Sequence, residues 1–204
     1  MVIADIFRPA SARSGVRLAY DAAAVLVGGI LASLAAQISV PLPFSPVPLT
    51  GQTFAVLLVG ALLGRTRGTA SMALYLFWGL AGLPVFAGGT GGVARLAGPT
   101  GGYLLGFLPA AWITGALAQR GWDRRVPTCA LAMAIGNAVI YLVGLPWLAA
   151  FVGIRNALPL GLIPFLPGDA VKLLLAVTLL PAGWRILARL GIAAPDLGWG
   201  PGKP

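Results

Sequence analysis

The amino-acid sequence predicts an all-α integral membrane protein with six transmembrane helices and both termini in the cytoplasm. Three observations lead to this fold class: 58% of the 204 residues are hydrophobic, only 9% are charged, and long uncharged runs separate the charges. A typical soluble domain carries roughly 25% charged residues. The sequence therefore lacks the charged surface that a soluble protein of this size needs, which excludes most soluble enzymes and binding modules.

The uncharged runs place the helices. The runs cover 22–64, 68–94, 96–119 and 126–154. A transmembrane helix needs about 20 apolar residues, so each of the last three runs holds one helix and the first holds two, interrupted by prolines. The segment from Pro167 is long enough for a sixth. The predicted helices are 18–38, 50–64, 68–83, 101–119, 127–150 and 167–190, in a single membrane domain (1–204) with cytoplasmic tails 1–17 and 191–204.

The basic residues orient these helices. Six helices put eleven of the fourteen Lys and Arg residues on the side of the termini and leave Arg95, Arg155 and Lys172 on the other. Short cytoplasmic loops carry an excess of Lys and Arg, so the termini are predicted to be cytoplasmic. These positions account for the net charge of +9. No basic patch remains for nucleic acid, which we do not expect as a partner.

The segment between the first two helices is predicted to re-enter the membrane. Helix 50–64 has about 15 residues, or roughly 22 Å, against a hydrocarbon core of about 30 Å. The proline-rich residues 39–49 must then dip in from the outer side, where they either line a cavity or form a structural plug. Thr50 is predicted to cap the helix, with Gln52 in its first turn, so that N–H donors point into the cavity.

A glycine-rich outer loop joins the third and fourth helices. Residues 84–102 read PVFAGGTGGVARLAGPTGG and hold seven glycines, which allow a backbone to approach a ligand closely. The phosphate-loop pattern GxxxxGK[ST] is absent, so the chain carries no ATPase motif of its own. Two irregular outer segments above a short helix predict a lidded pocket that faces outward.

The ionisable residues near this pocket are the candidate ligand contacts, because such residues in membrane spans are rare and usually functional. Asp169 and Lys172 share one helix face and form either a polar clamp for a neutral ligand with N–H and C=O groups, or a structural ion pair at the interface. Arg95 suits a ligand carboxylate, or anchors the loop at the interface. Asn137 either bridges helices or contacts ligand, and Tyr103 is either pocket wall or interfacial belt.

Small residues line one face of the first helix at a spacing of four: Ala24, Gly28, Ala32 and Ala36. Such a face packs closely against another helix, and its partner is either internal or another subunit, including a second copy of the chain. The sequence contains no His and no GxSxG pattern. We therefore predict no catalytic residues, no metal site and no cofactor.

Three motifs carry a family resemblance: PLPFSPVPLTGQTFAVLLVGALLG, LPVFAGGTGG with GPTGGYLLGF, and PGDAVKLLLA. Together they resemble BioY, the biotin-specific component of energy-coupling factor (ECF) transporters, over nearly the whole chain. The resemblance implies a high-affinity biotin binder in the bacterial cytoplasmic membrane, surrounded by lipid. It also implies a separate transmembrane coupling protein and two ATPase subunits as partners.

The resemblance further implies that Arg95, Asp169 and Lys172 are essential for handling biotin, and that the small-residue face of the first helix docks on the coupling protein. We expect Asp169 to accept a ureido N–H and Lys172 to support the carbonyl end, with Asn137 nearby. Arg95 then serves the carboxylate or holds the outer loop shut. The alternatives are a binder of another small vitamin or, in a different class, a membrane enzyme or assembly factor.

Overall fold

The long apolar stretches of the sequence form the helices of the computed structural model, which describes residues 1–9 and 13–192. A pair of two-residue antiparallel strands, β1 (Ser39–Val40) and β2 (Leu49–Thr50), closes the proline-rich segment between the first long helices. The helices are α1 (Ile3–Ile6), α2 (Ser14–Gln37), α3 (Gln52–Leu80), α4 (Val93–Ala97), α5 (Gly101–Gln119), α6 (Val126–Val152), α7 (Ile154–Gly161), the 3-10 turn η1 (Ile163–Phe165) and α8 (Leu166–Arg189).

Helix α3 corresponds to two predicted helices and is interrupted at one residue. Gly64 has φ 81° and ψ 173°, a conformation that is essentially restricted to glycine. A Cβ placed on Gly68 would lie 2.8 Å from Cα of Gly60, so the two halves of α3 fold back against each other. The predicted break is therefore present, but it is confined to Gly64, and the predicted connection 65–67 is helical instead.

The structure also differs from the prediction at other helix boundaries and contains additional short helices. The predicted cytoplasmic tail 1–17 contains α1 and the first turn of α2. The glycine-rich loop contains α4, and α7 precedes the last helix. Thr50 is wrong as the predicted cap: it belongs to β2, and Gly51 precedes the first helical residue. Most of the predicted tail 191–204, with Lys203, lies outside the described residues.

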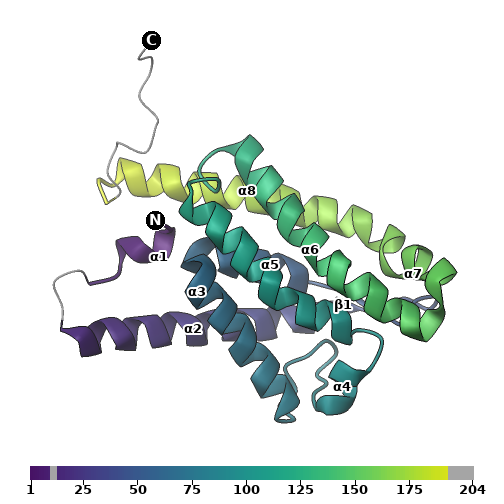
Figure 1. Ribbon diagram of the computed structural model, residues 1–204. Coiled ribbons are helices and arrows are strands. Elements are labelled where there is room, and N and C mark those ends of the chain that lie inside the picture. The colour runs from purple at the N-terminus through teal and green to yellow at the C-terminus, as the bar shows by residue number, and fades with distance from the viewer. Residues whose placement is uncertain (10–12, 193–204) are drawn as a thin grey trace.

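The helices pack in a sequence that runs across the bundle. α2 contacts α3, α3 contacts α5, α5 contacts α6, and α6 contacts α8, so α3 and α5 lie at the centre (Figure 1). Their core includes Met72, Tyr75, Phe107 and Ile140, all buried. Leucines at the outward surfaces of α2, α6 and α8 are exposed. An exposed apolar periphery around a packed interior is typical of a chain that is surrounded by lipid.

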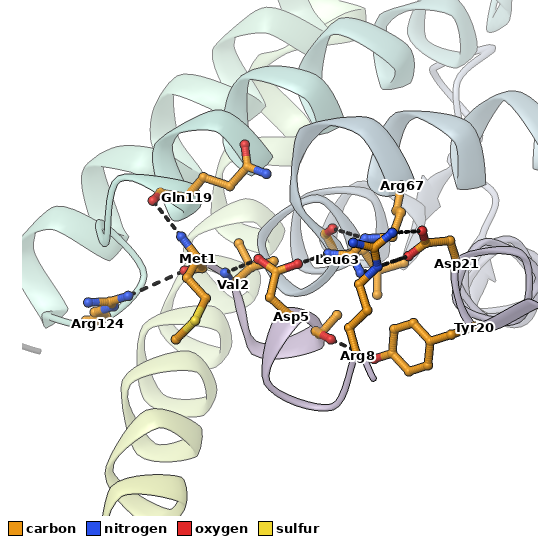
Figure 2. A network of polar contacts seen from close by, with 11 residues as sticks. Met1, Val2, Asp5, Arg8, Tyr20, Asp21, Leu63, Arg67, Gln119 and Arg124 are labelled. Atoms are coloured by element: carbon orange, nitrogen blue, oxygen red, sulfur yellow. Dashed lines mark hydrogen bonds and ion pairs between the residues drawn. The ribbon is translucent and has the colours of Figure 1, made fainter. Parts of the chain in front are cut away.

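Polar contacts fix the end of the bundle that carries the N-terminus (Figure 2). The amino group of Met1 donates to the backbone oxygen of Gln119 at 3.0 Å, and Arg67 pairs with both Asp5 and Asp21. Asp21 also pairs with Arg8. The C-terminal part of α8 lies at the same end, while α4, α7 and the strands lie at the opposite end (Figure 1).

Four helical stretches in the described part of the chain are long and apolar enough to cross a membrane. They are Ser14–Gln37, Gly101–Gln119, Val126–Val152 and the run Ile154–Arg189, which joins α7, η1 and α8. Together with the mostly helical fold, this agrees with the predicted all-α membrane class.

Candidate functional site

A cavity opens at the end of the bundle that is opposite to the N-terminus. Its wall comes from segments that are far apart in the sequence: the chain that leads into α3, the glycine-rich loop with α4, and the adjoining parts of α5, α6 and α8. Phe86, Phe107 and Phe165 give it an apolar lining. Both irregular segments that the sequence predicts over a pocket, 39–49 and 84–102, contribute to it.

Asp169 is the centre of the polar network in this wall. Its Oδ2 accepts a hydrogen bond from Asn137 Nδ2 at 2.9 Å and another from the Tyr141 hydroxyl, and its Oδ1 accepts one from Lys172 Nζ at 3.2 Å. An ionised carboxylate offers about four lone-pair sites. Three donors therefore leave Asp169 with the capacity to accept one further hydrogen bond.

Lys172 and Gln52 connect this network to the start of α3. Lys172 Nζ also donates to Thr53 Oγ1 at 2.8 Å, and its side chain is 18% exposed. Gln52 is buried and donates through Nε2 to the Tyr75 hydroxyl, while its Oε1 accepts from Thr50 Oγ1 at 3.0 Å. Both amide atoms of Gln52 are thus held by protein groups, which fixes the side chain at the cavity wall.

Arg95 differs from the other charged residues of the cavity. It belongs to α4, lines the cavity and is half-buried. Its guanidinium makes no hydrogen bond or ion pair with the residues that the structure describes. Tyr103 also lines the cavity, and its hydroxyl donates to the backbone oxygen of Gly161 at 2.9 Å, which joins α5 to the end of α7. A free guanidinium above an apolar cavity suits an anionic group of a ligand.

Five of the six predicted substrate-binding residues line the same cavity: Gln52, Arg95, Tyr103, Asp169 and Lys172. Asn137 lines a neighbouring apolar cavity between α3, α6 and α8 and reaches the site through Asp169. Tyr141 and Thr53 belong to the site but are not among the residues predicted from the sequence. Tyr141 follows Asn137 by four residues and therefore shares its helix face, which is a usable signal. Thr53 has no distinguishing pattern.

The small-residue face of α2 lies inside the chain. Gly28, Ala32 and Ala36 are buried, and a Cβ on Gly28 would lie 2.3 Å from Ser71 Oγ of α3. Of the two partners considered for this face, the structure gives the internal one. Of the four predicted docking residues, Ala24 alone keeps partial exposure.

The side chains of the cavity are suited to the recognition of a small ligand. The described residues contain no group of three or more His, Cys, Asp or Glu side chains that could hold a metal ion. The cavity instead combines an apolar lining with a carboxylate, an ammonium group and a guanidinium. Ligand sites of this kind are mostly apolar, with a few polar groups that fix orientation.

Known proteins resemble this chain over most of its length. The BioY family model matches residues 9–189. A probable biotin transporter BioY of Pyrococcus horikoshii is 46% identical over 147 residues, which cover 72% of this chain and 85% of the relative. The biotin transporter BioY of Rhizobium etli is 35% identical over 162 residues, or 76% and 87% of the two chains.

A solved structure, that of the S-component for biotin from an ECF-type ABC transporter, has the same fold. It matches with a TM-score of 0.73 and 26% sequence identity, and the match covers 90% of this chain and 96% of that one. The family match spans more than half of the sequence and includes every residue of the cavity. The chain therefore belongs to the BioY family.

Proposed function

We propose that this protein binds biotin and takes it up across the cytoplasmic membrane as the substrate-binding component of an ECF-type transporter. The observation that carries the proposal is the cavity in which a carboxylate, an ammonium group and an unpaired guanidinium surround an apolar lining. Biotin offers matching groups: a ureido ring with two N–H donors and one C=O, an apolar thioether ring and a carboxylate. The relatives are named as biotin transporters, which supports a transport role over an enzymatic one.

In the proposed complex, Asp169 accepts a ureido N–H through its remaining lone pair. Lys172, held by Asp169 and Thr53, directs an N–H toward the ureido oxygen. Arg95 pairs with the carboxylate or holds the glycine-rich loop shut over the ligand. Asn137 and Tyr141 keep the carboxylate of Asp169 oriented. The aromatic side chains of the lining cover the thioether ring.

The arrangement in the membrane is part of the same proposal. Six spans, with α3 contributing two halves that turn back at Gly64, place both termini in the cytoplasm and the cavity on the outer side. A separate coupling protein and two ATPase subunits supply the energy for reorientation. If α2 docks on the coupling protein, it does so through Ala24 and its outward-facing neighbours, since Gly28, Ala32 and Ala36 are covered by α3.

Calorimetry with purified protein tests the proposal. We expect biotin to bind with a Kd below about 1 µM. Asp169→Asn and Lys172→Ala should each weaken binding by tenfold or more, because each removes a hydrogen-bonded charge at the ligand. Arg155→Ala is the matched control, since Arg155 is an exposed cation of the same end that does not line the cavity.

One outcome would overturn the proposed ligand, and another would overturn the proposed binding residues. Absence of heat at about 10 µM protein would remove biotin as the ligand and favour another small vitamin. Equal affinity of the parent, Asp169→Asn and Lys172→Ala would leave biotin as the ligand but place it away from this pair.

A further inference from the structure

A groove at the opposite end of the bundle has the chemistry of a binding site and is not used in biotin handling. It lies between α3 and α5, at the end that carries the N-terminus. Arg65, Gln119 and Arg120 line its outer part, and Trp112, Ile113 and Ala116 line the part that continues along α5. The groove thus has a cationic end and an apolar channel.

Backbone packing fixes the cationic end. Arg65 is the residue after the glycine at which α3 turns back, and a Cβ on Gly115 would lie 2.5 Å from its backbone nitrogen. Arg65 is therefore held against the last turn and a half of α5, and Arg120 directly follows that helix. The turn at Gly64 brings the two exposed arginines to one groove.

The carboxylates at this end already have partners. Asp5 and Asp21 pair with Arg67, and Asp123 accepts a hydrogen bond from Trp184. Neither Arg65 nor Arg120 has a side-chain hydrogen bond or ion pair with a residue in the described part of the chain. Both guanidinium groups are therefore available to pair with an anion from outside these residues.

The apolar channel identifies the class of anion. Trp112 and Ala116 share one face of α5, and Arg120, four residues on, directly follows the helix, so the tryptophan lies about 12 Å deeper along the helix axis than the arginine. Trp112 is 48% exposed. A free phosphate would use only the two arginines. A phospholipid would place its phosphate between them and an acyl chain along Trp112, Ile113 and Ala116.

We propose that this groove binds one anionic phospholipid, such as phosphatidylglycerol, through its headgroup phosphate and the upper part of one acyl chain. Basic pockets between helices at the cytoplasmic side are suited to anionic lipid headgroups. The inference goes beyond biotin uptake and needs only that the chain lies in a membrane. The bound lipid would bridge the turn of α3 and the end of α5.

Native mass spectrometry of the full-length protein tests this. The protein is equilibrated with dioleoyl phosphatidylglycerol or dioleoyl phosphatidylcholine in dodecyl maltoside micelles, and bound lipids are counted. We expect one retained phosphatidylglycerol per chain and weaker retention of phosphatidylcholine. In Arg65→Gln/Arg120→Gln the affinity for phosphatidylglycerol should fall about thirtyfold, since both arginines near the phosphate are lost.

A matched variant separates the groove from net charge. Arg13→Gln/Arg189→Gln removes two exposed arginines at the same end but outside the groove, and it should retain the lipid. Retention by the groove variant equal to the parent would overturn the proposal, as would equal retention of both lipids. Loss in both double variants would show a general charge effect and would also overturn it.

A soluble probe tests the lipid assignment itself. Glycerol 3-phosphate should not replace the lipid, because it lacks an acyl chain, and Trp112→Ala should weaken lipid retention. Displacement by glycerol 3-phosphate as effectively as by lipid would make the site a phosphate site and contradict the proposal. Biotin titration of the same samples keeps this outcome distinct from a failure of the proposed uptake function.

Discussion

Arg95 is the charged residue of the cavity whose partner is missing from the described protein, so its role can be tested by changing the ligand. If Arg95 pairs with the carboxylate of biotin, Arg95→Gln should weaken biotin binding by about tenfold or more. The same substitution should hardly affect biotin methyl ester, which carries no charge there. Titration of biotin and its methyl ester against the parent and Arg95→Gln measures the coupling between the guanidinium and the ligand carboxylate.

A different result would assign Arg95 to the loop. Equal losses for biotin and its ester on Arg95→Gln would mean that the guanidinium acts on α4 and the glycine-rich segment rather than on the carboxylate. Arg155→Gln, on an exposed position of α7, controls for the lost positive charge at this end.

Tyr141 is a residue of the candidate site that was not predicted from the sequence. Its hydroxyl and the side-chain amide of Asn137 both donate to Asp169 Oδ2, and Tyr141 itself is uncharged. In Tyr141→Phe the Asp169 carboxylate loses one donor, so we expect a several-fold weaker affinity for biotin with the ring packing against Tyr103 preserved. Tyr20→Phe, at the opposite end, is the control, and calorimetry that gives equal affinities for parent and Tyr141→Phe would contradict this role.

Asp123 lies in the turn between α5 and α6, outside the membrane-spanning helices, and gives a pH dependence. Burial raises its pKa from 3.8 to about 6, although the hydrogen bond from Trp184, the charge of Arg124 and the N-terminal amine oppose the shift. Its Oδ1 has no hydrogen-bond partner among the described residues. The folded state therefore holds the proton more tightly than the unfolded state, and stability from this residue falls as pH rises from about 4 to about 6.

The measurement is the melting temperature in detergent of the parent and of Asp123→Asn between pH 4 and 7. The asparagine does not titrate, so the parent should lose up to about 3 kcal/mol relative to the variant over this range, or several degrees. The substitution also changes stability by an amount that does not depend on pH, and this amount cancels when the two pH profiles are compared. Melting curves that shift in parallel with pH would show that Asp123 does not behave as a buried acid.

At the scale of elements, the approach of α3 and α5 is set by glycines. A Cβ on Gly115 would meet the backbone nitrogen of Arg65 at 2.5 Å, and one on Gly60 would meet the backbone oxygen of Ala111 at 2.7 Å. Backbone atoms cannot move aside as a side chain can, so any larger residue there separates the two helices. These helices carry both the start of the cavity wall and the groove at the opposite end.

Gly115→Ala should therefore lower the melting temperature by about 5 °C, since overpacking typically costs about 1–3 kcal/mol. Gly15→Ala is the matched control, because a Cβ there meets nothing within 4 Å and alanine favours the helix. We expect the control to melt at or slightly above the parent temperature. If Gly115→Ala melts with the parent, the close approach of α3 and α5 does not limit stability.

For the whole molecule, the spacing of charges was enough to predict the membrane class and, within a few residues, the long helices. It predicted a break after residue 64 but placed it over 65–67 rather than at Gly64 alone, because a hydropathy pattern averages over a span whereas the turn depends on one glycine's φ. It did not predict α7 either, since Arg155, Asn156 and Pro159 interrupt the apolar pattern there.

The charged residues of the candidate site are the easiest to predict, whereas of its neutral residues Tyr141 and Thr53 were not predicted. Asp169, Lys172 and Arg95 stand out because ionisable groups are costly in lipid. The contact of Asn137 with Asp169 joins residues 32 apart on two helices. Helical periodicity gives the face of each residue but not the rotation of one helix against another, so the Asn137–Asp169 and Thr53–Lys172 pairs required the structure.

The proposed roles of the two ends of the bundle are biotin binding at the cavity end and lipid binding at the N-terminal end. Because these roles imply a defined orientation in the membrane, the orientation can be tested. In the described residues, ten basic residues belong to the N-terminal end and three, Arg95, Arg155 and Lys172, to the cavity end. By the positive-inside rule we expect the cavity to face outward, as the proposed uptake of biotin requires. Ile154, at the start of α7, is 84% exposed at the cavity end, and Ser14 is exposed at the start of α2.

Single-cysteine variants in a Cys129→Ser background measure this orientation with a charged, membrane-impermeant maleimide. Cys129 is fully buried, so the parent itself should give little labelling. Ile154→Cys should react in intact spheroplasts, whereas Ser14→Cys should react only after permeabilisation. Ala188→Cys, exposed near the end of α8, should behave as Ser14→Cys does, because the start of α2 and the end of α8 lie on the side of the N-terminus. Labelling of Ser14→Cys in intact spheroplasts would show that the N-terminal end faces outward. The cavity could then not receive biotin from outside.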